Sequence, residues 1–201
     1  MFTVEERHNA MKKIRDEVVA LKDSPLYAFR IKNGALPVIG EGSHAAKIMF
    51  IGEAPGVHEA KTGRPFVGAA GKFLNELLES VGAQRNDVYI TNIVKDRPPE
   101  NRDPTPHEIA TYGPFLDRQI NIIQPRAIVT LGRFSMYYIM RTLHVDFNSE
   151  PISKSHGKTY IAQTPFGELS ILTMYHPAAA LYNGAMRDVL KKDFAIVKKF
   201  L

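Results

Sequence analysis

Three short segments of this chain carry side chains whose types and spacing suit chemistry on a bound ligand. The first is GEAPG at 52–56, continued by GRPFVG at 63–68, so that Glu53 lies in a loop shaped by glycine and proline. Glycine permits positive φ and lets a ligand approach the backbone closely. The loop matches neither the dinucleotide fingerprint nor the phosphate-binding loop, because the spacing of glycines and the lysine of those motifs are absent.

The second and third segments each place a polar side chain at the end of an apolar run. Asn92 ends the run VYITN, and a buried asparagine needs partners for both its donor and its acceptor. His176 precedes Pro177, which favours an extended backbone there. Taken singly, Asn92 could be a structural cap, His176 a structural histidine and Phe66 a core residue that pins the glycine loop. Their combination indicates a site.

Apolar periodicity predicts the elements that position these segments. Strands are expected at 47–52, 88–92 and 127–131, with a hairpin or terminal strand pair at 159–162 and 168–174. Helices are expected at 4–21, 73–81, 106–123, 132–142 and 185–201, and a Gly/Pro-rich loop at 24–42. This alternation predicts an α/β fold, a single-domain three-layer αβα sandwich over residues 1–201 with a central, mainly parallel four-stranded sheet. Ligands bind beyond the carboxyl ends of such strands, and all three segments follow a strand.

Composition narrows the class of protein. Hydrophobic residues make up 44% of the 201 residues and charged residues 23%, as in ordinary soluble domains. No apolar run reaches the ~18 residues that span a bilayer, and the first residues lack the apolar core of a signal peptide, so we expect a cytoplasmic protein. The chain has no cysteine, which removes disulfides and thiolate chemistry. Its net charge of +5 suits a polyanionic partner without requiring one.

Together, the three segments resemble one known family. GEAPG with GRPFVG, TNIVK with RPP and NRDPTP, and HPAAAL are similar to the motifs of the iron–sulfur uracil-DNA glycosylases, the family four branch of the uracil-DNA glycosylase superfamily, over about residues 21–200. The resemblance implies a DNA repair enzyme that flips deoxyuridine out of DNA and hydrolyses its N-glycosidic bond, leaving an abasic site. It implies uracil-containing DNA as the partner of a monomer. A sliding clamp stays open as a second partner, and no membrane partner is expected.

The same resemblance implies roles for particular residues. His176 donates to uracil O2, where negative charge develops, and Glu53 holds or activates the water and stabilises the cationic sugar. Phe66 stacks on the base, Asn92 reads its O4 and N3–H, and Glu59 lies near its C5 edge. The full base-binding set is Gly52, Ala54, Gly56, Glu59, Phe66 and Asn92.

A second set is expected to contact DNA outside the base pocket. Basic side chains on the loops of the site side would grip phosphates, which supplies affinity independent of sequence. Leu181, beside Ala180, would enter the minor groove as an apolar wedge, although it could equally begin the core face of the last helix. The complete set is Lys95, Arg97, Arg102, Lys158, Ala180 and Leu181.

The sequence departs from the family at the place of the iron–sulfur cluster. The four family cysteines correspond here to Leu21, Ser24, Asp96 and Tyr112. Thiolates are the usual anchors of such clusters, so we expect no cluster and no metal cofactor. Aromatic packing, and a salt bridge of Asp96 with the adjacent Lys95 or Arg97, are expected to replace it.

Two other functions stay open. The chain could be a DNA-binding module that has lost catalysis, which the intact set Glu53, Phe66, Asn92 and His176 argues against. It could also be a glycosylase for hypoxanthine, xanthine or mismatched thymine, since Gly56 leaves space in the pocket. A panel of base substrates distinguishes the second alternative from uracil excision.

Overall fold

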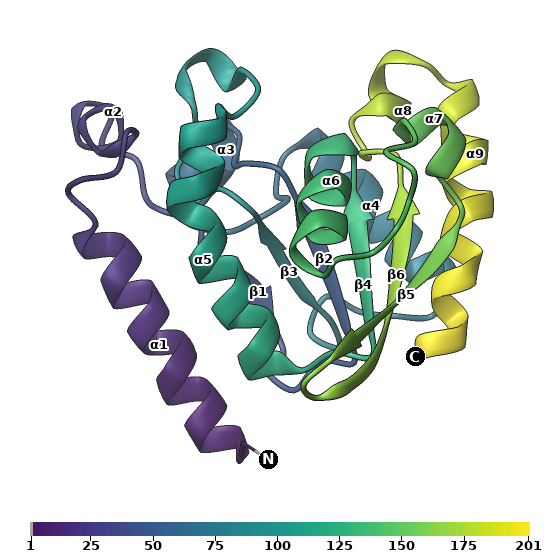
Figure 1. Ribbon diagram of the computed structural model, residues 1–201. Helices are drawn as coiled ribbons and strands as arrows, with labels where there is room; N and C mark the ends of the chain where they lie inside the picture. The colour runs from purple at the N-terminus through teal and green to yellow at the C-terminus, as the bar shows by residue number, and fades with distance from the viewer. Residues whose placement is uncertain (1) are drawn as a thin grey trace.

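A six-stranded mixed sheet forms the middle layer of the computed structural model, which describes residues 2–201 (Figure 1). The strand order is β1-β3-β2-β4-β6-β5. The inner strands run parallel, and they are β3 (Tyr89–Asn92), β2 (Ile48–Gly52), β4 (Ala127–Leu131) and β6 (Gly167–Met174). The edge strands β1 (Glu41–Gly42) and β5 (Thr159–Thr164) are antiparallel to their neighbours. The predicted parallel sheet is therefore present, and the two edge strands extend it.

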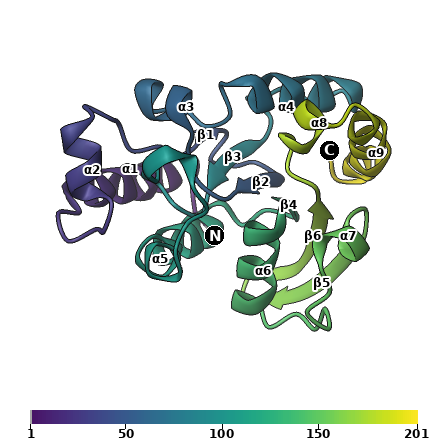
Figure 2. The same ribbon diagram turned by 90° about the horizontal axis from the view of Figure 1, so that it is seen from above.

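Helices cover both faces of the sheet, as the view onto the carboxyl ends of the strands shows (Figure 2). One face is covered by α5 (Pro106–Ile123) and α6 (Arg133–Thr142), with α1 (Val4–Ala20) packed on α5. The other is covered by α4 (Ala69–Ser80) and α9 (Ala185–Phe194). The shorter helices are α2 (Tyr27–Lys32), α3 (Val57–Thr62), α7 (Ile152–Ser155), α8 (Ala179–Tyr182), and the 3-10 turns η1 (Pro99–Asn101) and η2 (Ala195–Phe200).

Strand β2 shows why its sequence is continuously apolar. Its side chains alternate between the two faces, so Ile48 and Phe50 join the core under α4 and α9, while Met49 and Ile51 join the core under α5 and α6. All four are fully buried. A parallel strand covered on both faces has no solvent side, and its sequence therefore lacks the apolar–polar alternation of a half-exposed strand.

The predicted starts and ends of several elements are confirmed by their local contacts. At the start of α5, the Thr105 side chain accepts from the Glu108 backbone N–H, and the Glu108 carboxylate accepts from the Thr105 N–H. Gly82, just after α4, has a left-handed φ of 82°. Strands β5 and β6 form the predicted hairpin, with Thr164 opposite Gly167.

The expected loop at 24–42 and the expected last helix differ from the structure. The loop contains α2, which is too short to show periodicity, and β1, which exists only through its pairing with β3. The last helix was expected to reach residue 201, but α9 ends at Phe194 and the chain continues as the 3-10 turn η2.

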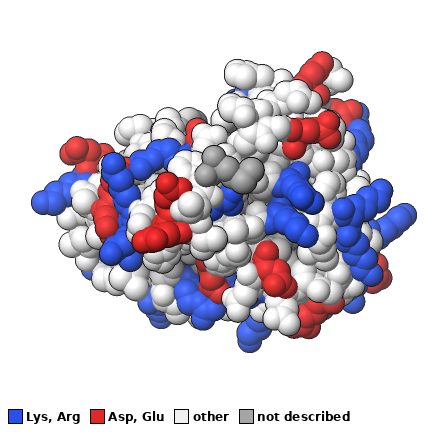
Figure 3. Space-filling view, turned by 90° about the horizontal axis from the view of Figure 1, so that it is seen from below, with Lys and Arg blue, Asp and Glu red and all other residues white. Residues whose placement is uncertain are grey.

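The face beyond the amino ends of the strands carries Lys and Arg side chains interspersed with Asp and Glu (Figure 3). The net charge of +5 is therefore not gathered into one basic area on this side. Among residues 2–201, no helix has the length and apolar character needed to cross a bilayer.

Candidate active site

A pocket of about 260 Å³ opens beyond the carboxyl ends of the inner strands, where the fold predicts a ligand. This volume is at the small end for ligand pockets and suits a single base. Every predicted catalytic and base-binding residue except Gly52 lines it. The lining is Glu53, Ala54, Pro55, Gly56, Glu59, Phe66, Ala70, Asn92, Pro98, Asn101, Arg102, His176 and Ala178.

Gly52 lies directly beneath two lining residues. It ends β2 opposite Asn92, its register partner at the end of β3. A Cβ at Gly52 would overlap the Asn92 Oδ1 and approach the Phe66 ring to 2.7 Å. Glycine at this position therefore lets the amide and the ring meet at one wall of the pocket.

Asn92 offers its carboxamide to the pocket. The residue is only 2% exposed, and its backbone carbonyl accepts from Lys95 Nζ at 2.7 Å. Its carboxamide, by contrast, takes part in none of the side-chain hydrogen bonds within residues 2–201, and it lines the pocket, from which its polar atoms are reached. Because the amide opens into the pocket and has no internal partner, it is available to a ligand that supplies both an acceptor and a donor.

His176 follows β6 and lies against Gly132, which directly follows β4 and has a φ of 97°. Its Nδ1 accepts from the Ala178 backbone N–H at 3.2 Å, which leaves the ring proton on Nε2. Burial lowers the pKa of His176 to about 4, against a smaller opposing effect of Glu59. His176 is therefore a neutral Nε2–H donor at neutral pH, and its ring stacks on Phe66 with centroids 5.6 Å apart.

Glu53 is partly buried at the start of the loop after β2. Burial raises the pKa of Glu53, the nearby Asp103 raises it further, and Arg133 lowers it. The loop itself is fixed to the loop after β3, because Ile93 N donates to Gly52 O and Val94 N donates to Glu53 O, both at 3.0 Å.

Glu59 holds the segment that carries Phe66. Its Oε1 accepts from the backbone N–H groups of Val67 and Gly68, each at 2.8 Å. A Cβ at Gly56 would lie 2.8 Å from the other oxygen, Oε2, so glycine leaves room for this carboxylate. The expected position near the base is consistent with Glu59 lining the pocket, and the contact with the Phe66 loop is an addition to it.

Lys95 was expected to grip phosphate, and the structure contradicts this. The side chain is 0% exposed, and its Nζ donates to Thr91 Oγ1 at 2.9 Å, to Asn92 O at 2.7 Å and to Gln119 Oε1 at 2.6 Å. Burial lowers its pKa to about 7. Lys95 therefore links the end of β3 to α5 through hydrogen bonds, and its buried ammonium group is not available to DNA.

The other expected phosphate contacts lie at the surface. Arg102 is at the pocket rim, where it pairs with Glu108 at 2.6 Å, and Arg97 donates to Asn101 Oδ1 at 2.7 Å. Lys158 pairs with Glu150 at 2.8 Å, and its backbone carbonyl accepts from Thr173 near the carboxyl end of β6. Arg102 and Lys158 are exposed, and Arg97 is half-buried.

In the segment after His176, the two residues expected to contact DNA, Ala180 and Leu181, differ in exposure. Ala180 is buried and packs into the core, so its side chain does not offer the expected contact to DNA. Leu181 is 45% exposed on α8. The next residue, Tyr182, for which the sequence predicted no role, is 91% exposed. A large aromatic side chain beside the candidate leucine was the signal available in the sequence.

Three of the four positions that correspond to cluster cysteines meet in the structure. Tyr112 OH donates to Asp96 Oδ2 at 2.6 Å and also shares a hydrogen bond with Ser24 Oγ. Leu21 packs against the core instead. The expected salt bridge of Asp96 with Lys95 or Arg97 is wrong, because Asp96 pairs with Arg30 at 3.1 Å. These side chains satisfy one another and present no thiolate, so they do not fit an iron–sulfur cluster.

Removing the Tyr112 hydroxyl is expected to destabilise this network. Tyr112→Phe should lower the free energy of unfolding by about 1–3 kcal/mol, because Ser24 and the buried Asp96 each lose a hydrogen-bond partner. Urea unfolding measures the change. Tyr138→Phe, which removes a partly buried bond to Asp117, is the matched control. A loss at Tyr112 no larger than at Tyr138 would show that the network is not a main contributor to stability.

The fold and the pocket define an α/β protein with a small pocket of polar and apolar side chains at the carboxyl ends of its strands. The sequence model of the Uracil DNA glycosylase superfamily matches residues 39–199. The chain therefore belongs to this superfamily.

The chain is also similar to curated relatives over most of their length. It is 47% identical to a type-4 uracil-DNA glycosylase of Sulfurisphaera tokodaii, over 95% of this chain and 84% of the relative. It is 48% identical to the type-4 enzyme of Saccharolobus solfataricus, over 94% and 85%. It is 39% identical to the type-4 enzyme of Thermotoga maritima, over 100% and 98%.

Proposed function

We propose that this chain is a uracil-DNA glycosylase, a hydrolase that removes uracil from DNA in base excision repair and leaves an abasic site. Superfamily membership and the type-4 relatives support this activity. The observation that carries it is the carboxamide of Asn92, which opens into the pocket without an internal partner and lines it together with Phe66 and His176. A panel of oligonucleotides with one uracil, cytosine, thymine or hypoxanthine tests it. Release of uracil alone is the expected result.

Base recognition follows from the two halves of the Asn92 amide. Its nitrogen donates to uracil O4 and its oxygen accepts from N3–H. Cytosine presents an amino group and a bare N3 at these places, so neither bond forms. Each unpaired buried group costs about 1–3 kcal/mol, which discriminates against an abundant wrong base. The base has to leave the duplex to reach the pocket, and Phe66 offers a face on which it stacks.

Bond cleavage places negative charge on the departing base. The electron pair of the C1′–N1 bond moves to N1 and is delocalised to O2, while the sugar becomes cationic. The Nε2–H of neutral His176 donates to O2 and stabilises this anion as a preorganised donor. Water then bonds to C1′ and gives its proton to Glu53 or to solvent, and the Glu53 carboxylate also stabilises the cationic sugar.

The role of Glu53 predicts the acid side of the pH profile. Glu53 acts as the carboxylate, and burial raises its pKa above the ordinary value of 4.5. Activity should therefore be full above this raised pKa and fall as the pH drops through it, while His176, with a pKa of about 4, is still neutral. Single-turnover rates between pH 4 and 8 measure the profile. If Glu53→Gln keeps the same acid limb, another group is responsible.

The remaining assignments extend this proposal. Residues 1–201 form a single catalytic domain that acts as a monomer and without a metal. An iron–sulfur cofactor is not part of the proposal, because the network at Asp96 does not fit a cluster. Arg97, Arg102 and Lys158 contact phosphates, and Leu181 enters the duplex. A sliding clamp and a cytoplasmic location stay predictions from the sequence.

A further inference from the structure

The backbone of Phe66 adopts a conformation that phenylalanine rarely takes. Its φ is 51°, in the left-handed region, where the Cβ of an L-residue is crowded against the chain. The ring is nevertheless buried and forms a wall of the base pocket. Because this conformation is unfavourable by itself, the surroundings of Phe66 must hold it.

Arg85 restrains this segment from its carbonyl side. Its Nη2 donates to Pro65 O at 2.7 Å, and its Nη1 donates to Phe66 O at 3.2 Å. Gly71 of α4 crowds the same carbonyl, since a Cβ there would overlap Phe66 O. The Phe66 carbonyl thus lies between helix α4 and the guanidinium of Arg85, which belongs to the loop before β3.

The guanidinium of Arg85 is itself fixed. Its Nη1 donates to Asn75 Oδ1 at 3.1 Å, and its Nε contacts Glu41 Oε1 at 3.4 Å. The side chain is 16% exposed. Arg64 pairs with the same Glu41 at 2.9 Å but is mostly exposed, and its guanidinium makes no hydrogen bond to the Phe66 segment within residues 2–201. A planar fork of donors suits this geometry, whereas the point charge of lysine does not.

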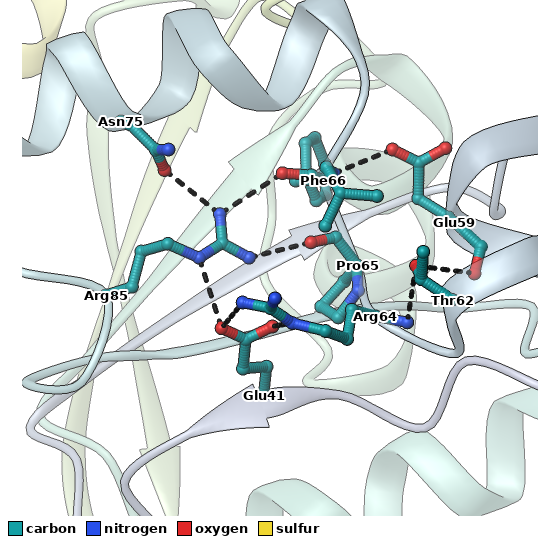
Figure 4. A network of polar contacts seen from close by, with 9 residues as sticks. Glu41, Glu59, Thr62, Arg64, Pro65, Phe66, Asn75 and Arg85 are labelled. Atoms are coloured by element: carbon teal, nitrogen blue, oxygen red, sulfur yellow. Dashed lines mark hydrogen bonds and ion pairs between the residues drawn. The ribbon is translucent and has the colours of Figure 1, made fainter.

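The opposite side of the same segment faces an anion. Glu59 Oε1 accepts from Val67 N and Gly68 N, so Arg85 and Glu59 lie on opposite sides of Phe66 (Figure 4). The carbonyls before the turn point at a cation, and the N–H groups after it point at a carboxylate. This arrangement matches the polarity of the peptide groups and fixes both ends of the turn.

We propose that Arg85 is a positioning residue of the glycosylase, which holds the Phe66 ring in the orientation that stacks on the flipped base. The inference rests on the proposed function and adds to it a residue outside the pocket lining. Arg85 touches no reacting atom, so its effect on the reaction passes through Phe66. Loss of Arg85 should therefore act on the same step as loss of the Phe66 ring.

Single-turnover uracil release at saturating enzyme tests this. Arg85→Ala and Arg85→Lys should both be slower than the unmodified protein by about 10- to 100-fold, comparable to loss of one stacking contact. Arg64→Ala, which leaves the Phe66 carbonyl bonds intact, should change the rate less than about twofold. Equal rates for Arg85→Lys and the unmodified protein would overturn the proposal.

A double-mutant cycle separates positioning from general destabilisation. In a Phe66→Ala background, Arg85→Lys should cost no more than about twofold, because the ring that it positions is already gone. Thermal unfolding of all variants establishes that each is folded at the assay temperature. Additive losses, or no loss from Phe66→Ala alone, would contradict an action through Phe66. Failure of the unmodified protein to release uracil would instead refute the proposed function.

Discussion

Replacing His176 by alanine is expected to slow uracil release by about 10²–10³-fold, the usual effect of removing one preorganised donor to a developing anion. The Ala178 N–H holds Nδ1 as the acceptor, so the ring proton is on Nε2, and the residue lines the pocket. Burial keeps the pKa of His176 near 4, and the donor is therefore a neutral imidazole throughout the neutral range. Single-turnover rates at saturating enzyme isolate the chemical step from DNA binding.

The matched control for this change is His107→Ala. His107 is exposed in the first turn of α5 and does not line the pocket. Its replacement should leave the rate within about twofold, as for most surface substitutions. A rate for His176→Ala within about threefold of the unmodified protein would contradict the assigned donor role, since an oxyanion donor contributes far more.

Replacing Asn92 by alanine is expected to slow uracil release by about 10²–10³-fold, because two hydrogen bonds to the base are lost at about 1–3 kcal/mol each. The change should also reduce the preference for uracil over cytosine, since alanine reads neither edge. Competition between uracil- and cytosine-containing oligonucleotides measures both effects. The control is Asn86→Ala, because Asn86 is exposed in the loop before β3, at the amino ends of the parallel strands.

Retention of strong uracil preference in Asn92→Ala would show that another group reads the base. Asn101, which also lines the pocket, would then be the next residue to examine, although its side chain already accepts from Arg97. A loss of rate without a loss of preference would instead indicate that Asn92 shapes the pocket.

The sequence was sufficient for the inner sheet and for most of the site lining. Strands β2, β3 and β4 lie in short, mostly apolar runs of sequence, and each site segment begins at or just after the end of a strand. The parallel topology alone therefore brings Glu53, Asn92 and His176 to one edge. Local capping signals such as Thr105 with Glu108 were equally readable. These features depend on neighbours in sequence or on the regular order of the sheet.

Contacts between distant segments could not be predicted. Asp96 pairs with Arg30, which is 66 residues away, although Lys95 and Arg97 are adjacent to it in sequence. Lys95 was expected at the surface, yet it turns inward because Gln119 on α5, 24 residues later, offers it an acceptor. Arg85 is likewise 19 residues from the Phe66 carbonyl that it holds. No periodicity or motif marks such pairs.

The most direct test of the central claim is incubation of the purified protein, in the presence of EDTA, with an oligonucleotide that contains one uracil. Free uracil and alkali-sensitive abasic sites are both quantified. The structure predicts that each abasic site is matched by one released uracil, with His176→Ala and Asn92→Ala strongly impaired. Absence of free uracil with the protein in large excess, or release of a different base from the panel in its place, would contradict the proposed activity.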